Sequence, residues 1–388
     1  MEVWFSTLLI LFVIGSMTAT ANYGERFPGF RKLLIVSILM LNFLMCFYPA
    51  LALVSPDAED ISSTNRIGAF VSGFATAALA SLFLLYPVRR YLARFLPKAP
   101  ARPTTVANHG LPVPMMNTLD NGIVVMEAVD PKQRIISGGS HAWRQAQLDT
   151  GSGFRPNSVI HMWAGVIVIY FVGLQLMTLF LADGLEGLAE DIGVSYSTLI
   201  ANFLPMVIIP LMGVGLFMRR DLRQSLFRLG IKPLNLEGLA KSLFVSGAAT
   251  FGLVIWAMVV GAIWQGVVSP ETFEEQSEAS NALADSITTL GLAFVVAFTA
   301  GVGEEIAFRG AMQPVFGFWF TTFIFVAAHT QYALTPAWLI ILVVALAFAL
   351  LRKHFDTTTA ILTHFFYDFT LLILLLVSKE ISWLTIPM

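Results

Sequence analysis

Long apolar stretches dominate the chain and alternate with polar connections. Ten of them approach or reach the length of a spanning helix, which needs about 20 apolar residues. They cover residues 3–21, 33–54, 67–87, 159–182, 199–218, 242–268, 287–303, 315–330, 336–351 and 358–378. The eighth and ninth are short, so each crosses with a tilt or enters the bilayer without a full crossing. The pattern predicts an all-α, polytopic membrane helix bundle with about ten transmembrane helices.

The first stretch has one feature of a signal peptide, because Ala19-Thr20-Ala21 resembles a cleavage site. The preceding Met1-Glu2-Val3 lacks the basic residues with which signal peptides begin. We therefore expect a retained helix.

Composition supports a membrane protein. Hydrophobic residues make up 56% of the chain and charged residues 12%, against about 45–50% and about 25% in soluble domains. This excludes a disordered chain, a disulfide scaffold and an ordinary soluble enzyme. The single cysteine, Cys46, lies in an apolar run and excludes an intramolecular disulfide, a multi-cysteine zinc site and an iron–sulfur site. The net charge of −2 indicates no nucleic-acid partner.

The basic residues predict the orientation. Of the 23 Lys and Arg residues, 20 lie in alternate connections, at 22–32, 88–158, 219–241 and 352–353. The intervening connections are acidic. Because cytoplasmic loops carry the excess of Lys and Arg, we expect ten crossings, with both termini outside and the basic loops in the cytoplasm.

The longest connection divides the chain. Residues 1–87 are expected to form an N-terminal three-helix membrane extension and 88–158 a proline-rich cytoplasmic loop or linker. The more apolar run 121–137 has the alternation of a small hairpin. Residues 159–388 are expected to form a second, seven-helix unit.

Ionisable side chains inside apolar spans are costly and are functional candidates by default. Glu304, Glu305 and Arg309 follow the seventh stretch. Glu305 and Arg309 are four residues apart on a helix, in the favourable order for an ion pair. Glu304 points about 100° away from Glu305, which leaves it available as a general acid or base. The alternative is a structural cluster of two acids and one arginine at the membrane interface.

Three further polar residues lie nearby in the sequence. His329 ends the eighth stretch, where a lone histidine often caps a helix or sits at the interface. His364 and Asp368 share one face of the tenth stretch, because they too are four residues apart. Taken alone, this pair could form a purely structural, buried hydrogen bond. Three polar groups within 65 residues of a hydrophobic chain, however, favour a common site.

These residues form three motifs in order: Glu304-Glu305-x-x-x-Arg309-Gly310, Phe325-x-x-x-His329 and His364-x-x-x-Asp368. The set resembles the motifs of the CAAX-processing and bacteriocin-processing (abortive-infection-like) intramembrane endopeptidases. The likeness is expected to extend over 159–388, where Leu229-Gly230-Ile231 also resembles a family segment. The resemblance gives no expectation for residues 1–158.

The resemblance implies site residues and roles. Glu304 would activate water, His329 would position it, and His364 with Asp368 would stabilise the oxyanion. Glu305 and Arg309 would support the site. Family members most often carry Asn in place of Asp368, and an ionised Asp cannot donate a hydrogen bond to an oxyanion. No metal and no cofactor are implied.

The sequence therefore predicts an intramembrane endopeptidase of a bacterial inner or plasma membrane, with a membrane-associated protein or peptide as substrate. A zinc protease on the same residues and a non-enzymatic membrane scaffold or immunity protein of this fold remain alternatives. A transporter ranks below them, because repeat symmetry with helix-breaking prolines in both halves is missing. The substrate, its lipidation and the oligomeric state are not determined by the sequence.

Overall fold

The computed structural model describes residues 2–54, 61–98, 116–118, 124–126, 153–181, 194–232, 235–329 and 335–385. Most of the predicted loop at 88–158 lies outside the described residues. Two short antiparallel strands lie within it, β1 (Met116–Thr118) and β2 (Val124–Met126). The predicted hairpin thus has one strand inside the run 121–137 and its partner before it.

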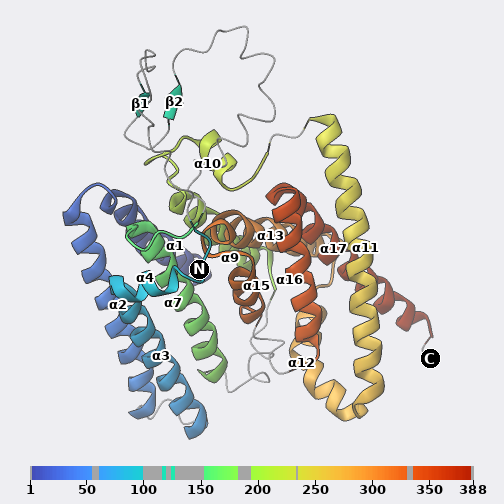
Figure 1. The fold of residues 1–388 in the computed structure, drawn as a ribbon. Helices are drawn as coiled ribbons and strands as arrows, with labels where there is room; N and C mark the ends of the chain where they lie inside the picture. Colours follow the sequence, from blue (N-terminus) through green and yellow to red (C-terminus); the bar gives the residue numbers. More distant parts are fainter. Residues whose placement is uncertain are drawn as a thin grey trace.

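Helices make up nearly all of the described structure (Figure 1). The N-terminal helices are α1 (Glu2–Gly24), α2 (Pro28–Val54), α3 (Ser63–Leu84) and α4 (Tyr86–Leu92). The middle of the chain forms α7 (Val159–Leu181), α9 (Tyr196–Gly213), α10 (Leu222–Arg228), α11 (Leu236–Val267) and α12 (Pro270–Ser286). The C-terminal part forms α13 (Leu290–Glu304), the π-helix η2 (Glu305–Met312), α14 (Gln313–Phe316), α15 (Phe318–Ala327), α16 (Ala337–His354) and α17 (Thr357–Thr385).

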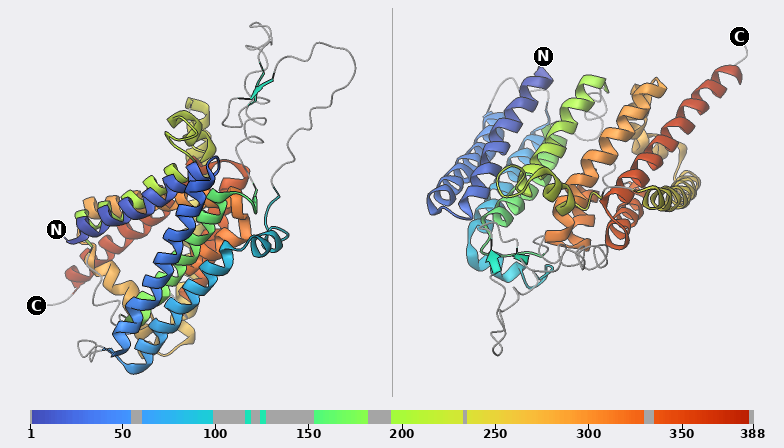
Figure 2. Two further views of the ribbon diagram at one scale, coloured as in Figure 1. Left: turned by 90° about the vertical axis from the view of Figure 1, so that its left-hand side faces the viewer. Right: turned by 90° about the horizontal axis from the view of Figure 1, so that it is seen from above.

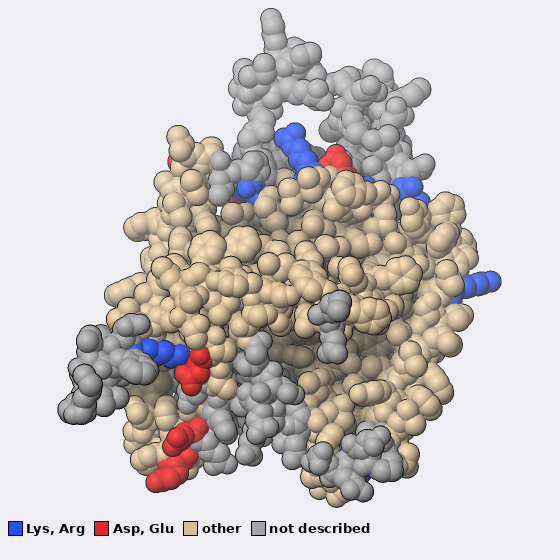
Figure 3. Space-filling model, turned by 180° about the vertical axis from the view of Figure 1, so that it is seen from behind, with Lys and Arg blue, Asp and Glu red and all other residues tan. Residues whose placement is uncertain are grey.

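Within the described residues, nine helices are long and apolar enough to cross a membrane, and α15 is a tenth, shorter apolar helix. This confirms the predicted all-α, polytopic membrane fold. Figure 3 shows the accompanying surface, with a broad, largely uncharged band between charged side chains gathered toward its upper and lower edges.

Four helices lie side by side in the order α1, α9, α13, α17, as the view from above shows (Figure 2). The helices α2 and α7 pack against α1, and α3 packs against α2 and α7. Their shared core includes Trp163, fully buried, whose indole Nε1 donates to Thr18 Oγ1 at 2.9 Å. The first helix of the predicted 159–388 unit therefore packs on the N-terminal helices, and the domain division itself stays a prediction.

A polar seam fixes α17 against α11. Ser246 Oγ donates to the Thr359 carbonyl at 3.2 Å, and Thr250 Oγ1 donates to the Thr363 carbonyl at 3.4 Å. Small hydroxyl side chains allow helices in membranes to approach closely and to hydrogen-bond across the interface. At the start of α17, Asp356 Oδ1 accepts from the backbone N–H of Thr359 at 2.8 Å and caps the helix.

The seventh predicted stretch ends later than the sequence indicates. The sequence placed its end at 303, but the helix continues through η2 and α14, giving an unbroken span Leu290–Phe316. The polar residues that interrupt the apolar run do not end the helix, because they find partners inside the bundle. Glu304 and Glu305 consequently lie near the middle of this span rather than at its end.

The direction of α16 follows from two hydrogen bonds. Arg309 Nη2 donates to the Ala345 carbonyl at 3.2 Å, and one turn later Gln313 Nε2 donates to the Ala349 carbonyl at 3.0 Å. Both helices advance together, so α16 runs parallel to the Leu290–Phe316 span. Because two parallel helices need a return of the chain between them, α15 belongs to the returning part of the chain.

Candidate active site

The two glutamates lie where α13 passes into the π-helix η2. A π-helical turn contains one extra residue, so its hydrogen bonds locally run from i to i+5 instead of i to i+4. Such turns are frequent at functional sites. Two arginines outside η2 bind its carbonyl oxygens. Arg228 Nη1 donates to Gly310 O at 3.2 Å, and Arg352 Nε donates to Arg309 O at 3.2 Å. These bonds help to hold the widened turn in place.

Glu305 and Arg309 form the predicted ion pair. Arg309 Nε lies 3.4 Å from Glu305 Oε2, and both side chains are fully buried. The guanidinium also lies over the ring of Phe325, with Cζ 4.1 Å from the ring centroid. A buried cation with a carboxylate, a carbonyl and an aromatic face around it is compensated from several sides.

His364 lies between two carboxylates. Its Nε2 is 3.2 Å from Asp368 Oδ2, the predicted i,i+4 contact, and its Nδ1 is 3.0 Å from Glu305 Oε1. The ring stacks on Phe348 with centroids 4.6 Å apart. Because ionised carboxylates only accept hydrogen bonds, the geometry fits a ring that donates from both nitrogens.

This arrangement differs from the predicted one in two respects. The sequence paired Glu305 with Arg309 alone, whereas Glu305 also contacts His364 of the neighbouring helix α17. The predicted role of His364 with Asp368 in stabilising an oxyanion is met most simply by a ring N–H of His364 that faces the oxyanion. In the structure both nitrogens face carboxylates, because packing brings α13 and α17 together closely enough for Glu305 to reach the ring.

Glu304 has different surroundings from Glu305. Glu304 as a whole is half-buried, but its Oε2 atom is buried and has no hydrogen-bond partner among the described residues. It interacts electrostatically with His329, His364 and Asp368. A buried carboxylate oxygen without a protein partner is unusual and requires an explanation, such as a catalytic role or a bound water.

His329 follows the last turn of α15. Its Nδ1 lies 2.8 Å from the Phe325 carbonyl oxygen. Since a carbonyl only accepts, Nδ1 carries a hydrogen in this contact, which fixes the orientation of the ring. Ten residues of α15 rise only about 15 Å, about half of a hydrocarbon core. This length fits the prediction that His329 lies within the bilayer.

Phe325 connects the three motifs. Its ring is buried and lies 4.8 Å from His329, 6.2 Å from His364 and beneath the guanidinium of Arg309. The structure thus brings together side chains from α13, η2, α15 and α17 that are up to 64 positions apart.

The sequence analysis missed the contributions of α16 and of the two arginines that bind η2. Ala345 acts through its carbonyl and Phe348 through its ring face, and both lie in an apolar run without a distinguishing pattern. Arg228 and Arg352 carried a signal as basic residues, but one that indicated only membrane orientation.

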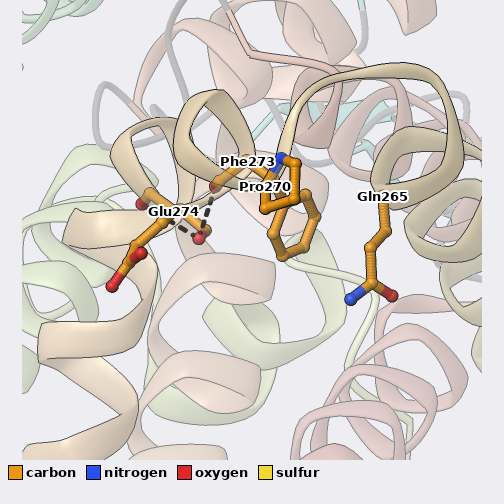
Figure 4. Close-up of a pocket in the computed structure, with 5 residues that line it drawn as sticks. Gln265, Pro270, Phe273 and Glu274 are labelled. Atoms are coloured by element: carbon orange, nitrogen blue, oxygen red, sulfur yellow. Dashed lines mark hydrogen bonds between the residues drawn. The ribbon is translucent and has the colours of Figure 1, made fainter.

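Among the described residues, neither a group of metal ligands nor the cavity described below indicates a second functional site. Within the part of the chain that the structure describes, no three His, Cys, Asp or Glu side chains are arranged to hold a metal ion. A cavity of about 360 Å³ opens where α11 meets α12, lined by Gln265, Pro270, Phe273, Glu274 and Ser277 (Figure 4). None of these belongs to the cluster around Glu304, and the Ser277 hydroxyl already donates to the Phe273 carbonyl.

Comparison with known proteins identifies the segment that holds the cluster. Residues 286–370 match the family described as Type II CAAX prenyl endopeptidase Rce1-like. The matched range contains all three motifs and confirms the predicted resemblance. No curated protein and no solved structure matches the chain.

Proposed function

We propose that Glu304 is the general base of an intramembrane endopeptidase. The match of residues 286–370 to the family described as Type II CAAX prenyl endopeptidase Rce1-like supports a membrane protease. The Glu304 carboxylate takes a proton from a water molecule as that water attacks the carbonyl carbon of a peptide bond. The C–N bond of the tetrahedral intermediate then breaks, and the protonated Glu304 gives its proton to the departing amine. The observation that carries the proposal is the buried Oε2 of Glu304, which has no hydrogen-bond partner among the described residues and interacts with two histidines. A base must reach the water directly, and this oxygen has capacity for it.

His329 is proposed to position the attacking water with Glu304. The Phe325 carbonyl accepts the Nδ1 hydrogen, which fixes the orientation of the imidazole ring. Orientation of an imidazole through its second nitrogen is the function of the carboxylate in other hydrolases.

His364 and Asp368 are proposed to stabilise the oxyanion, but the geometry favours a modified form of that role. Both ring nitrogens already face carboxylates, so the ring offers its positive charge to the developing oxyanion rather than a dedicated N–H. A preorganised charge in a dry site stabilises a transition state without reorganisation. Asp368 is then a positioning residue that orients the ring, and Glu305 with Arg309 anchors the other side.

The substrate is proposed to be a membrane-associated protein or peptide. The family description refers to prenylated CAAX proteins, so a prenylated C-terminal peptide is the first substrate class to test. An unprenylated peptide of the same sequence is its matched control. Preference for the prenylated form would place the lipid in the recognition step.

Purified protein in proteoliposomes tests the activity and its metal requirement together. We expect peptide cleavage, located by mass spectrometry, that persists after treatment with EDTA or phenanthroline. The proposal uses no metal, so cleavage lost on chelation and restored by zinc, with stoichiometric zinc in the untreated protein, would favour the zinc protease instead. Cleavage of no peptide by folded protein would favour the non-enzymatic scaffold.

A further inference from the structure

A second group of charges, one buried and four half-buried, lies beside the cluster around Glu304, at one end of the spans α7, α9 and α16. It comprises five arginines, which we call the arginine cluster: Arg155, Arg219, Arg220, Arg228 and Arg352. Arg228 interacts electrostatically with Arg219, Arg220 and Arg352, and Arg220 with Arg155. Like charges have therefore been collected from four separate segments of the chain.

The arginine cluster lacks acidic partners at ion-pair distance within the described residues. Glu25 and Asp356 are the carboxylates that act on it, but each has other partners. Glu25 Oε1 accepts from Ser158 Oγ at 2.5 Å and from the backbone N–H of Ile160 at 3.0 Å. Asp356 pairs with Lys232 at 3.2 Å and caps α17.

Burial makes this unbalanced charge costly. The side chain of Arg228 is only 6% exposed, and burial together with the neighbouring arginines lowers its pKa to about 9. Burial and Arg219 lower the pKa of Arg220 to about 10. Both remain charged at neutral pH, so the protein keeps several repelling cations in a poorly solvated place, a situation that an anion would relieve.

Unused donors are present in the cluster. Arg219 Nε is buried and has no hydrogen-bond partner among the described residues. The neighbouring donors are partly occupied by backbone carbonyls, with Arg220 donating to Val214 and Arg228 to Gly310. Guanidinium groups bind phosphate oxygens through paired N–H donors, so several converging guanidinium groups fit a phosphate group.

The surroundings favour a lipid as the carrier of this phosphate. The cluster lies where apolar spans end, which is the depth of lipid headgroups. Beside it, Phe217 is 84% exposed and Leu222 is 50% exposed, so apolar side chains face outward next to the cations. Basic pockets between membrane helices bind anionic headgroups in this way.

We propose that the arginine cluster is a binding site for the headgroup phosphate of an anionic phospholipid. Two of its members, Arg228 and Arg352, hold carbonyl oxygens of η2, so the bound lipid is positioned to stabilise the π-helical turn next to Glu304. An effect of the lipid on cleavage rests on the proposed function, whereas binding of the lipid does not.

The test measures lipid binding and unfolding temperature of the full chain in nanodiscs of phosphatidylcholine, with and without phosphatidylglycerol. Inorganic phosphate is added to the neutral nanodiscs as a separate arm. We expect phosphatidylglycerol to raise the unfolding temperature and to remain bound in native mass spectrometry. Arg219→Gln should weaken retention by a factor on the order of ten, the usual effect of one charge-assisted hydrogen bond. It should fold normally, because Arg219 holds no other element.

Arg223→Gln is the matched control, because Arg223 is exposed on the same connection and its loss removes the same charge without touching the cluster. It should retain wild-type binding. An equal loss in both variants would indicate only diffuse attraction and would overturn the proposal. The same stabilisation by inorganic phosphate alone would overturn the lipid assignment, and no response to either anion would overturn the site.

Discussion

Glu304 and Glu305 are adjacent in the sequence, but their side chains have different surroundings in the bundle. Glu305 is fully buried between Arg309 and His364, and its Oε2, which accepts no hydrogen bond, lies 3.4 Å from Arg309 Nε. The buried Oε2 of Glu304 has neither a hydrogen bond nor an ion pair among the described residues. Helical geometry made part of this difference predictable, since residues one apart point about 100° away from each other. The contact of Glu305 with His364 was not predictable, because it joins residues 59 positions apart through tertiary packing.

The burial of Glu305 predicts a stability effect. Glu305→Gln removes the charge that compensates both Arg309 and His364, and breaking a buried pair costs about 3–5 kcal/mol. Thermal unfolding in detergent or nanodiscs should show this loss. Glu304→Gln is the matched control and should unfold close to the wild-type temperature. Equal destabilisation of both variants would contradict the division of roles.

Asp368 offers a second test at this scale. Its Oδ2 lies 3.2 Å from His364 Nε2, which favours an orienting role over direct donation to the oxyanion. Asp368→Asn should then lower kcat by a factor on the order of 10² or more and alter the pH profile. If Asn retains most of the activity with an unchanged pH profile, Asp368 acts as a protonated donor instead.

The helices α13 and α17 determine whether the site residues meet. The two backbones are close at Gly301, where an added Cβ would be 3.0 Å from the Phe365 backbone nitrogen and 3.3 Å from the Ile361 carbonyl oxygen. Small residues at such positions allow membrane helices to pack closely. The sequence does not predict this contact, because a glycine at a helix–helix contact cannot be distinguished in an apolar span from a glycine that faces lipid.

The close approach predicts a loss of activity from a single methyl group. Gly301→Ala should push α17 away by a few tenths of an ångström and lengthen the contact between Glu305 and His364. We expect kcat to fall, because misplacement of catalytic groups is costly. Gly252→Ala on α11 is the control, since nothing lies within 4 Å of its added Cβ. Equal kcat values for the two variants and the wild type would refute the argument.

The π-helix shows where prediction from sequence fails at the scale of elements. Glu304, Glu305 and Arg309 interrupt the apolar pattern, so the sequence placed a helix end at 303. The helix continues because partners from distant segments satisfy these side chains and because Arg228 and Arg352 bind the carbonyls of η2. Hydropathy measures a residue's preference for lipid and contains no information about such partners.

The whole molecule agrees more closely with the sequence. Nine long helices and the short α15 match the ten apolar stretches, because length and composition alone determine whether a helix can cross a bilayer. The parallel course of α16 and the Leu290–Phe316 span requires the chain to return through α15. The predicted orientation, with both termini outside and the basic loops in the cytoplasm, stays a prediction.

Labelling of single cysteines tests the orientation. In a Cys46→Ser background, Arg223→Cys should react with a membrane-impermeant maleimide only from the cytoplasm, and Glu271→Cys only from outside. Both positions are exposed and lie on connections of opposite predicted location. Labelling of Arg223→Cys in intact cells would place this connection outside the cell and contradict the predicted topology. Glu304 would then lie in the outer half of the membrane instead of the cytoplasmic half.

The central claim is that Glu304 activates the water that cleaves the peptide bond. The most direct measurement is kcat for one verified cleavage site, comparing the wild type with Glu304→Gln in folded, reconstituted protein. Glutamine keeps the shape but cannot take a proton, so the rate should fall by a factor on the order of 10² or more. Glu271→Gln on the exposed start of α12 controls for loss of charge and should cleave at the wild-type rate. Cleavage by Glu304→Gln at the wild-type rate would contradict the account.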